Sequence, residues 1–215
     1  LDEPFSAVDQ MNRQGLYRLL ADLRRELAIP IVLVTHDLAE AALLADRLVV
    51  MDAGTVLQTG TPATIHHAPR NARVADLVGI HNRFQGLWLG PAHQIGMGNL
   101  RWVPALGASA EPAPVLTVRD KGKLPEGQAV AWVIPSDGVS LHPVEAITAD
   151  DFDATVTEAR HLGEISLATL AVAAVPGARL TLTLTGAQRL DLAVGARFAV
   201  RLNRERVHVM PVRSP

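Results

Sequence analysis

The chain has 215 residues, of which 48% are apolar, and its formal net charge at neutral pH is −2. This length is enough for one large domain or two small ones, and the nearly balanced charge gives no electrostatic reason to expect a nucleic-acid partner. The sequence has no run of about 18 or more apolar residues of the kind that spans a membrane, and the absence of cysteine excludes disulfides and thiolate metal sites.

The first third of the sequence alternates between helical and strand-like patterns. Residues 6–9 offer short polar side chains that can cap a helix, leucines then recur at helical spacing up to Leu27, and Pro30 ends this helix. The apolar run 31–35 is short and rich in β-branched residues, which predicts a buried parallel strand. His36 follows at the carboxyl end of that strand, where open α/β sheets bind their ligands.

The next segment predicts a helix, a hairpin and a second helix. Asp37 and Glu40 have the spacing of a capping box, for a helix that runs to about Ala45. Residues 47–52 and 55–59, on either side of a turn at 53–54, predict a β-hairpin. Thr61-Pro62 is typical of the start of a short helix. This part of the chain therefore predicts an α/β fold.

From about Phe84 the pattern changes to short strands divided by glycine, proline and polar turns. Residues 107–114 and 120–127 are expected to be loops. The number and spacing of the strands predict a small all-β barrel. The candidate strands are residues 84–89, 100–103, 115–118, 129–134, 139–141, 154–158, 166–173, 179–184, 197–202 and 206–210.

Two features of this second part have alternative interpretations. Trp88, Trp102 and Trp132 fall on predicted strands, where they pack in a core or interface or else form a base-stacking platform. The lack of a basic stripe favours packing. Residues 149–153 carry three aspartates, but they lack the turn glycine and the downstream glutamate of a calcium loop, which favours a solvated turn over a metal site.

The acidic start of the chain and His36 form its main chemical motif. The first nine residues read Leu1-Asp2-Glu3-Pro4-Phe5-Ser6-Ala7-Val8-Asp9. Phosphoryl transfer to water needs a carboxylate for magnesium, a group that orients the attacking water and a sensor near the terminal phosphate. Asp2, Glu3 and His36 have this chemistry. Taken alone, an acidic pair before a proline is also a common turn feature, and a histidine after a strand is often a packed or surface residue.

In this order the motifs resemble the second half of an ATP-binding-cassette (ABC) ATPase, with the Walker-B end, the D-loop and the switch histidine. The segments 37–47, 51–54, 58–62 and 75–79 also resemble prokaryotic import ATPases, so that the resemblance covers roughly residues 1–86. It implies that Asp2 holds Mg²⁺ through its water shell and that Glu3 orients or deprotonates the attacking water. It also implies that His36 contacts the γ-phosphate and that Asp9 faces the partner subunit of an ATP-sandwiched dimer.

The second part resembles the carboxyl-terminal regulatory domain called TOBE. Residues 133–141 are similar to its I-R-P-E-D-V-x-L landmark, with Ile134 in place of the usual arginine and Ser136 in place of the usual glutamate. Contacts made by those two charged side chains are therefore not carried over. In this family the domain is an OB-like barrel that packs against its counterpart in a dimer.

Two motifs of the family are not found in this sequence. There is no phosphate-binding GxxxxGK[ST] loop, no L-S-G-G-Q-like signature, and the only lysines are Lys121 and Lys123. The chain is therefore expected to be a fragment of a longer ATPase. Residues 1–81 are expected to be the carboxyl-terminal remnant of the α/β P-loop ATPase domain, and residues 82–215 an all-β OB-like (TOBE) regulatory and dimerisation barrel.

The resemblance implies that the intact protein is the ATP-binding, energy-coupling subunit of a bacterial ABC solute importer that uses ATP and Mg²⁺. The expected partners are a second copy of the chain, membrane permease subunits and a periplasmic solute-binding protein, at the cytoplasmic face of the inner membrane. The alternative is a regulatory and dimerisation module without ATPase activity of its own. The chain by itself is not expected to hydrolyse ATP, and its sequence does not specify the solute.

Overall fold

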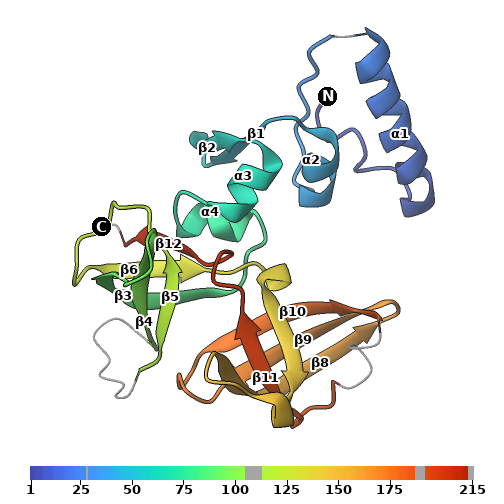
Figure 1. Ribbon diagram of the computed structural model, residues 1–215. Coiled ribbons are helices and arrows are strands. Elements are labelled where there is room, and N and C mark those ends of the chain that lie inside the picture. The colour runs from blue at the N-terminus through green and yellow to red at the C-terminus, as the bar shows by residue number, and fades with distance from the viewer. Residues whose placement is uncertain (28, 105–112, 187–191, 213–215) are drawn as a thin grey trace. The chain divides into compact units, whose positions relative to one another are not determined.

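A computed structural model describes residues 1–27, 29–104, 113–186 and 192–212 and divides into two compact units (Figure 1). Unit 1 comprises residues 1–70 and 77–79, and unit 2 comprises residues 71–76 and 80–215. The assignment of 1–81 to an ATPase remnant and of 82–215 to a regulatory barrel stays a prediction. Residues 107–112 of the predicted loop 107–114 lie outside the described residues.

Unit 1 holds the helices and the hairpin predicted for the first third of the chain. Its elements are α1 (Gln10–Leu27), α2 (Leu38–Leu44), β1 (Leu48–Asp52), β2 (Thr55–Gly60) and α3 (Pro62–His67). Another short helix, α4 (Ala72–Leu77), lies at the boundary of the two units and was not predicted. Asn71 begins it, because its side chain accepts a hydrogen bond from the Val74 amide at 2.9 Å.

Local chemistry explains where these elements begin and turn. Asp37 caps α2 by accepting hydrogen bonds from the amides of Ala39 and Glu40 at 2.8 and 3.2 Å, and Thr61 caps α3. The tight turn of the hairpin places Ala53 and Gly54 at φ values of 45° and 75°. Two successive positive φ values suit the right-handed twist of a two-residue hairpin.

The predicted buried strand at 31–35 is wrong. Val34 makes one isolated parallel bridge with Asp2, and the rest of the run forms no ladder. Val32 and Val34 are 76% and 54% exposed. A parallel strand becomes buried only when further strands flank it and helices cover the sheet. Among the described residues of unit 1, only the short segment 1–3 pairs with this run.

Apart from most of α4 and short 3₁₀ turns, the regular structure among the described residues of unit 2 is β-strand, and each of the ten predicted strands is present. The longest is the hairpin strand β8, which extends beyond the predicted residues at both ends. The bounds are β3 (Arg83–Pro91), β4 (Met97–Val103), β5 (Val115–Arg119), β6 (Ala129–Val133), β7 (Val139–Pro143), β8 (Asp151–Leu162), β9 (Ile165–Val172), β10 (Arg179–Thr185), β11 (Arg197–Leu202) and β12 (His208–Pro211), with short 3₁₀ turns η1 (Ser136–Gly138) and η2 (Val144–Ala146).

These strands form two antiparallel five-stranded sheets, where the sequence predicted one small barrel. The strand orders are β12-β6-β3-β4-β5 and β10-β9-β8-β11-β7. Figure 1 shows the last strand, β12, returning to the first sheet beside β6. Strand spacing alone does not reveal this division, because alternation along one strand does not identify its partners.

One hydrophobic core serves both sheets of unit 2. Trp88, Trp102 and Trp132 are at most 1% exposed, which confirms the packing role and excludes a base-stacking platform. Trp102 also contacts Phe152 of β8, with ring centroids 5.5 Å apart, and so joins the first sheet to the second. The close fit extends to Gly98, where an added Cβ would lie 2.3 Å from the Trp88 ring.

Two further contacts tie β10 and β8 into this unit. The buried Asn82 side chain exchanges two hydrogen bonds with the Thr181 backbone, accepting at 2.6 Å and donating at 2.9 Å. The solvated turn predicted for segment 149–153 is confirmed only for residues 149–150, which form an exposed turn, because Asp151 and Asp153 lie on β8. Asp151 and Asp153 pair with Arg201 and Arg197 of the neighbouring strand β11. Asp150 pairs with Arg204, which follows β11.

Candidate active site

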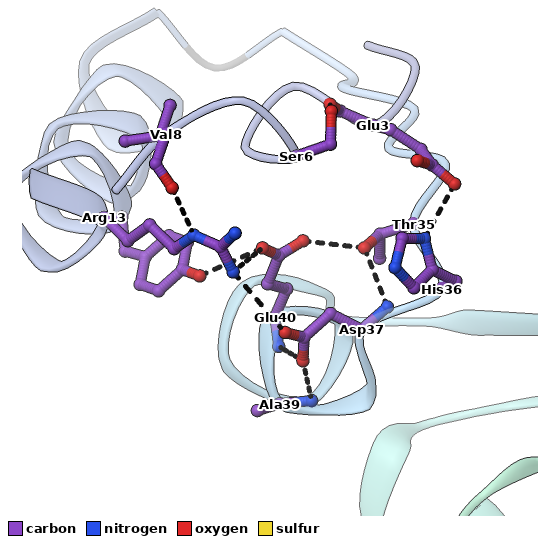
Figure 2. A network of polar contacts seen from close by, with 10 residues as sticks. Glu3, Ser6, Val8, Arg13, Thr35, His36, Asp37, Ala39 and Glu40 are labelled. Carbon is purple, nitrogen blue, oxygen red and sulfur yellow. Dashed lines mark hydrogen bonds and ion pairs between the residues drawn. The ribbon is translucent and has the colours of Figure 1, made fainter. Parts of the chain in front are cut away.

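The backbone of segment 1–3 lies beside that of residues 32–36 and brings Glu3 to His36. The Val34 amide donates to the Leu1 carbonyl, and the Glu3 amide donates to the Val34 carbonyl, both at 2.8 Å. Glu3 Oε1 then lies 2.8 Å from His36 Nδ1 (Figure 2). The structure therefore joins two of the residues that the sequence singled out, although 33 positions separate them.

Glu3 holds an unusual backbone conformation at this point. Its φ is +40°, in the left-handed region that non-glycine residues seldom occupy. Such a conformation costs about 1–2 kcal/mol for an L-residue. A turn offsets this cost, because the Ser6 amide and hydroxyl both donate to the Glu3 carbonyl, at 3.2 and 2.9 Å. Local strain of this kind is more frequent at functional sites than elsewhere.

Glu3 changes the acid–base behaviour of His36. The hydrogen bond from the ring to the Glu3 carboxylate, and then the negative charge of that carboxylate, raise the pKa of His36 above its usual value. The side chains of His36 and Glu3 are 78% and 44% exposed, so both are open to a ligand. A cationic imidazole next to a carboxylate at an open surface is suited to meeting a phosphate and a water molecule together.

Asp2 and Asp9 are placed differently from this pair. Asp2 has an exposed side chain and takes part, through its backbone, in the bridge to Val34. Asp9 lies at the start of α1, where its carboxylate accepts from the backbone amide and the side-chain amide of Asn12 at 3.1 and 2.8 Å. These two bonds hold the pKa of Asp9 below its ordinary value. The structure does not bring Asp9 to the Glu3–His36 pair.

The carboxylates at the start of the chain fit the chemistry of magnesium. Mg²⁺ prefers hard oxygen ligands and commonly takes one or two carboxylates, completing its shell with waters and substrate phosphates. Asp2 and Glu3 provide adjacent carboxylates with exposed side chains. These carboxylates fit an ion that is held mainly by water and phosphate. The Asp2 carboxylate is an oxygen donor of the type that Mg²⁺ prefers.

A polar cluster beside this pair was missed by sequence reasoning. Glu40, expected to complete the capping box, instead buries its carboxylate, which is bonded to the hydroxyls of Tyr17 and Thr35 (Figure 2). Arg13 lies next to it, 3.8 Å from Glu40 Oε1. A usable signal was the single tyrosine of the chain, which interrupts the leucine-rich pattern of α1.

Comparison with known proteins supports the class that these features indicate. Residues 134–210 match the TOBE domain family. Over 96% of its length the chain is 31% identical to an Fe(3+) ions import ATP-binding protein of Rhizobium meliloti, of which it covers 51%. It is 35% identical, over 82% of its length, to a sulfate/thiosulfate import ATP-binding protein of Chromobacterium violaceum, of which it covers 44%.

A third relative is a spermidine/putrescine import ATP-binding protein of Borreliella afzelii, 38% identical over 60% of this chain and 38% of that protein. Among solved structures, that of the molybdate-bound cytoplasmic protein ModG is similar with a TM-score of 0.46 and 18% identity, covering 62% of this chain and 98% of ModG. The chain thus spans about half or less of the length of the curated relatives named here.

These matches confirm the resemblance predicted from the sequence. The chain is similar to the carboxyl-terminal part of import ATP-binding proteins of the ABC class, and it carries a TOBE domain match near its end. Among the described residues, none of the helices combines the length and apolar character needed to cross a bilayer.

Proposed function

We propose that this chain carries one half of an ATP-hydrolysing site, together with the regulatory domain, of the energy-coupling subunit of a bacterial ABC solute importer. The observation that supports this proposal best is the 2.8 Å contact between Glu3 and His36. It occurs in a sequence related to import ATP-binding proteins over 96% of its length.

Each residue of the site has a distinct proposed role. The Glu3 carboxylate orients the attacking water and accepts its proton, and His36 contacts the γ-phosphate. The raised pKa of His36 favours the cationic ring, which attracts an anionic phosphate more strongly than the neutral ring. Asp2 would hold Mg²⁺ through water, and the bound ion would neutralise charge on the nucleotide phosphates.

The remaining proposed properties concern assembly. Asp9 faces the second subunit of an ATP-bound homodimer, and residues 82–215 form an OB-like TOBE domain that regulates and stabilises that dimer. Residues 1–81 contribute the carboxyl-terminal part of the ATPase domain. The partners are membrane permease subunits and a periplasmic solute-binding protein, and the location is peripheral, at the cytoplasmic face of the inner membrane.

The second candidate function is a regulatory and dimerisation module that hydrolyses no ATP by itself. The lack of a GxxxxGK[ST] loop in this sequence favours it for the chain taken alone, because backbone amides and a lysine in such a loop supply much of the affinity for phosphate. Calorimetric titration of the 215-residue chain with ATP tests this second candidate function. Micromolar binding would contradict the expectation that this chain alone neither binds ATP tightly nor hydrolyses it.

The hydrolytic role can be tested in a chimera in which this chain replaces the matching part of the Rhizobium meliloti relative. Once ATP turnover of the chimera is established, Glu3→Gln should lower it by about 10²-fold or more, as expected for a lost general base. ATP-dependent dimerisation should persist. Glu26→Gln, on the exposed surface of α1, is the matched control and should retain turnover. Near-normal turnover in Glu3→Gln would show that Glu3 has been assigned the wrong role.

A further inference from the structure

The side chain of Glu40 is buried in unit 1, at 5% exposure. Both of its oxygens are engaged: Oε1 accepts from the Tyr17 hydroxyl at 3.0 Å, and Oε2 accepts from the Thr35 hydroxyl at 2.6 Å. Arg13 Nη1 lies 3.8 Å from Oε1 and supplies the compensating charge. A buried carboxylate is unfavourable unless it is paired and hydrogen-bonded, and these three groups meet that requirement.

The partners of Glu40 come from separate segments that hold the candidate site. Thr35 directly precedes His36, and its hydroxyl also accepts a hydrogen bond from the Asp37 amide at 3.0 Å. The Thr35 hydroxyl therefore links the Glu40 carboxylate to the Asp37 amide, which directly follows His36 in the chain. Figure 2 shows Glu40 on one side of Thr35 and the His36–Glu3 contact on the other.

The same carboxylate also holds the start of α1. Arg13 donates from Nε to the Val8 carbonyl at 2.9 Å, immediately before Asp9. Tyr17 packs edge-on against Phe5, with ring centroids 4.9 Å apart, and Phe5 is only 5% exposed. Burial, together with the hydrogen bond to Glu40, raises the pKa of the Tyr17 hydroxyl, so it remains a donor at neutral pH.

We propose that Glu40 is a positioning residue that fixes His36 opposite Glu3 and ties this pair to the Asp9-bearing start of α1. Glu40 bonds to neither Glu3 nor His36. Its negative charge adds a lesser part to the raised pKa of His36, and its hydrogen bonds and ion pair act through Thr35 on one side and through Arg13 and Tyr17 on the other. The catalytic consequence rests on the proposed function. The geometric consequence does not, because it concerns contacts within this chain alone.

The test uses the whole 215-residue chain and the ¹⁵N chemical shifts of the His36 ring at one fixed pH. The variant Glu3→Gln serves as a reference, because it gives the ¹⁵N shifts of the His36 ring without a carboxylate partner. Glu40→Gln cannot accept from both hydroxyls in the same way, because its amide nitrogen is a donor only. Its His36 ring signal should move from the wild-type position towards that of Glu3→Gln. The amide spectrum of unit 2 should stay unchanged, and Glu26→Gln should leave His36 at the wild-type position.

A second pair of variants keeps the proposal testable if Glu40→Gln fails to fold. Thr35→Val keeps the shape of the side chain and removes the hydroxyl, whereas Thr35→Ser keeps the hydroxyl. Thr35→Val should shift the His36 ring signal, and Thr35→Ser should restore it. A merely structural role for Glu40 would lower the stability of unit 1 and leave the ring signal of the folded molecules unchanged.

Two outcomes would overturn the proposal: a wild-type His36 signal in folded Glu40→Gln, or identical His36 signals in Thr35→Val and Thr35→Ser. Failure of the proposed function looks different. In that case Glu3→Gln would leave ATP turnover of the chimera intact, while the effect of Glu40→Gln on the His36 ring would remain.

Discussion

The two units of the chain bury their apolar side chains to different extents. Unit 2 has one continuous core, in which side chains such as Leu100 and Trp132 are fully buried. Unit 1 is the smaller unit but leaves most of its large apolar side chains accessible, including Leu19 at 54% and Val32 at 76% exposure. An apolar groove of about 990 Å³ runs between α1, residues 29–36, α2 and β1.

This difference shows that an apolar pattern predicts burial only where a partner surface exists. Residues 31–35 have the composition of a buried strand, yet their main chain pairs with only one short segment. The strands of unit 2 find their partners within the described chain, and their alternation matches their burial. Unit 1 should therefore be the less stable of the two.

The largest expected change in stability is a difference between two leucine-to-alanine substitutions, one in each unit. Leu100→Ala removes a fully buried side chain from unit 2 and should lower its stability by about 2–5 kcal/mol. Leu19→Ala removes an exposed side chain from α1 and should change stability by at most about 0.5 kcal/mol. All three tryptophans lie in unit 2, so their fluorescence reports its unfolding, while helical circular dichroism mainly reports unit 1.

These two readouts also test the comparison itself. Leu100→Ala should shift the fluorescence transition and leave the helical transition in place. Coincident shifts of both transitions would show that the units unfold together and that their stabilities cannot be ranked separately.

A smaller effect is expected from Asn82→Ala. This change leaves the Thr181 amide and carbonyl without their buried partner, and an unsatisfied buried group costs about 1–3 kcal/mol. Denaturant unfolding followed by tryptophan fluorescence measures the loss. Asn203→Ala is a suitable control, because Asn203 is exposed and its side chain accepts only from the Glu205 amide in a turn. Equal losses in the two variants would contradict a special role for Asn82.

Sequence reasoning succeeded where local chemistry decides the structure and failed where distant partners decide it. The cap at Asp37, the turn at Ala53-Gly54 and the positions of the strands in unit 2 depend on local sequence, and all were predicted. The division of the strands between two sheets depends on pairings such as β6 with β12, which no periodicity reveals. For the site, the motifs singled out Glu3 and His36 separately, whereas their contact and the bonds of Glu40 to Tyr17 and Thr35 follow from three-dimensional packing.

Acid should weaken unit 2 through Asp151. Its carboxylate accepts from Arg201, and also from the amide and hydroxyl of Thr148, and these bonds hold the pKa of Asp151 far below its ordinary value. A group with a lowered folded-state pKa adds stability above its unfolded value, about 3.9 for aspartate, and this stability is lost as pH falls towards the folded value.

Asp151→Asn should therefore destabilise unit 2 at pH 7, and the difference from wild type should shrink as the pH falls below about 4. Asp150→Asn provides the neighbouring control. Asp150 also pairs with an arginine, but its side chain is 65% exposed, and such surface pairs contribute about 0–1 kcal/mol. Fluorescence-detected unfolding at several pH values gives both comparisons. An Asp151→Asn difference that stays constant below pH 4 would argue against this linkage.

The smallest expected effect is a pH dependence of unit 1 in a different pH range. The hydrogen bond and the charge of Glu3 raise the pKa of His36. A group with a raised folded-state pKa contributes stability that is fully present below its unfolded value, about 6.5 for histidine, and is lost as the pH rises through the folded value. Because both side chains are exposed, solvent screening keeps the effect small.

The helical transition should thus move to slightly lower denaturant concentration as the pH rises from about 6 to about 8, while the tryptophan transition stays unchanged. Glu3→Gln should remove this pH dependence of the helical transition. An equal slope in Glu3→Gln would assign the pH dependence to another group of unit 1 and would leave the Glu3–His36 contact without a measurable part in its stability.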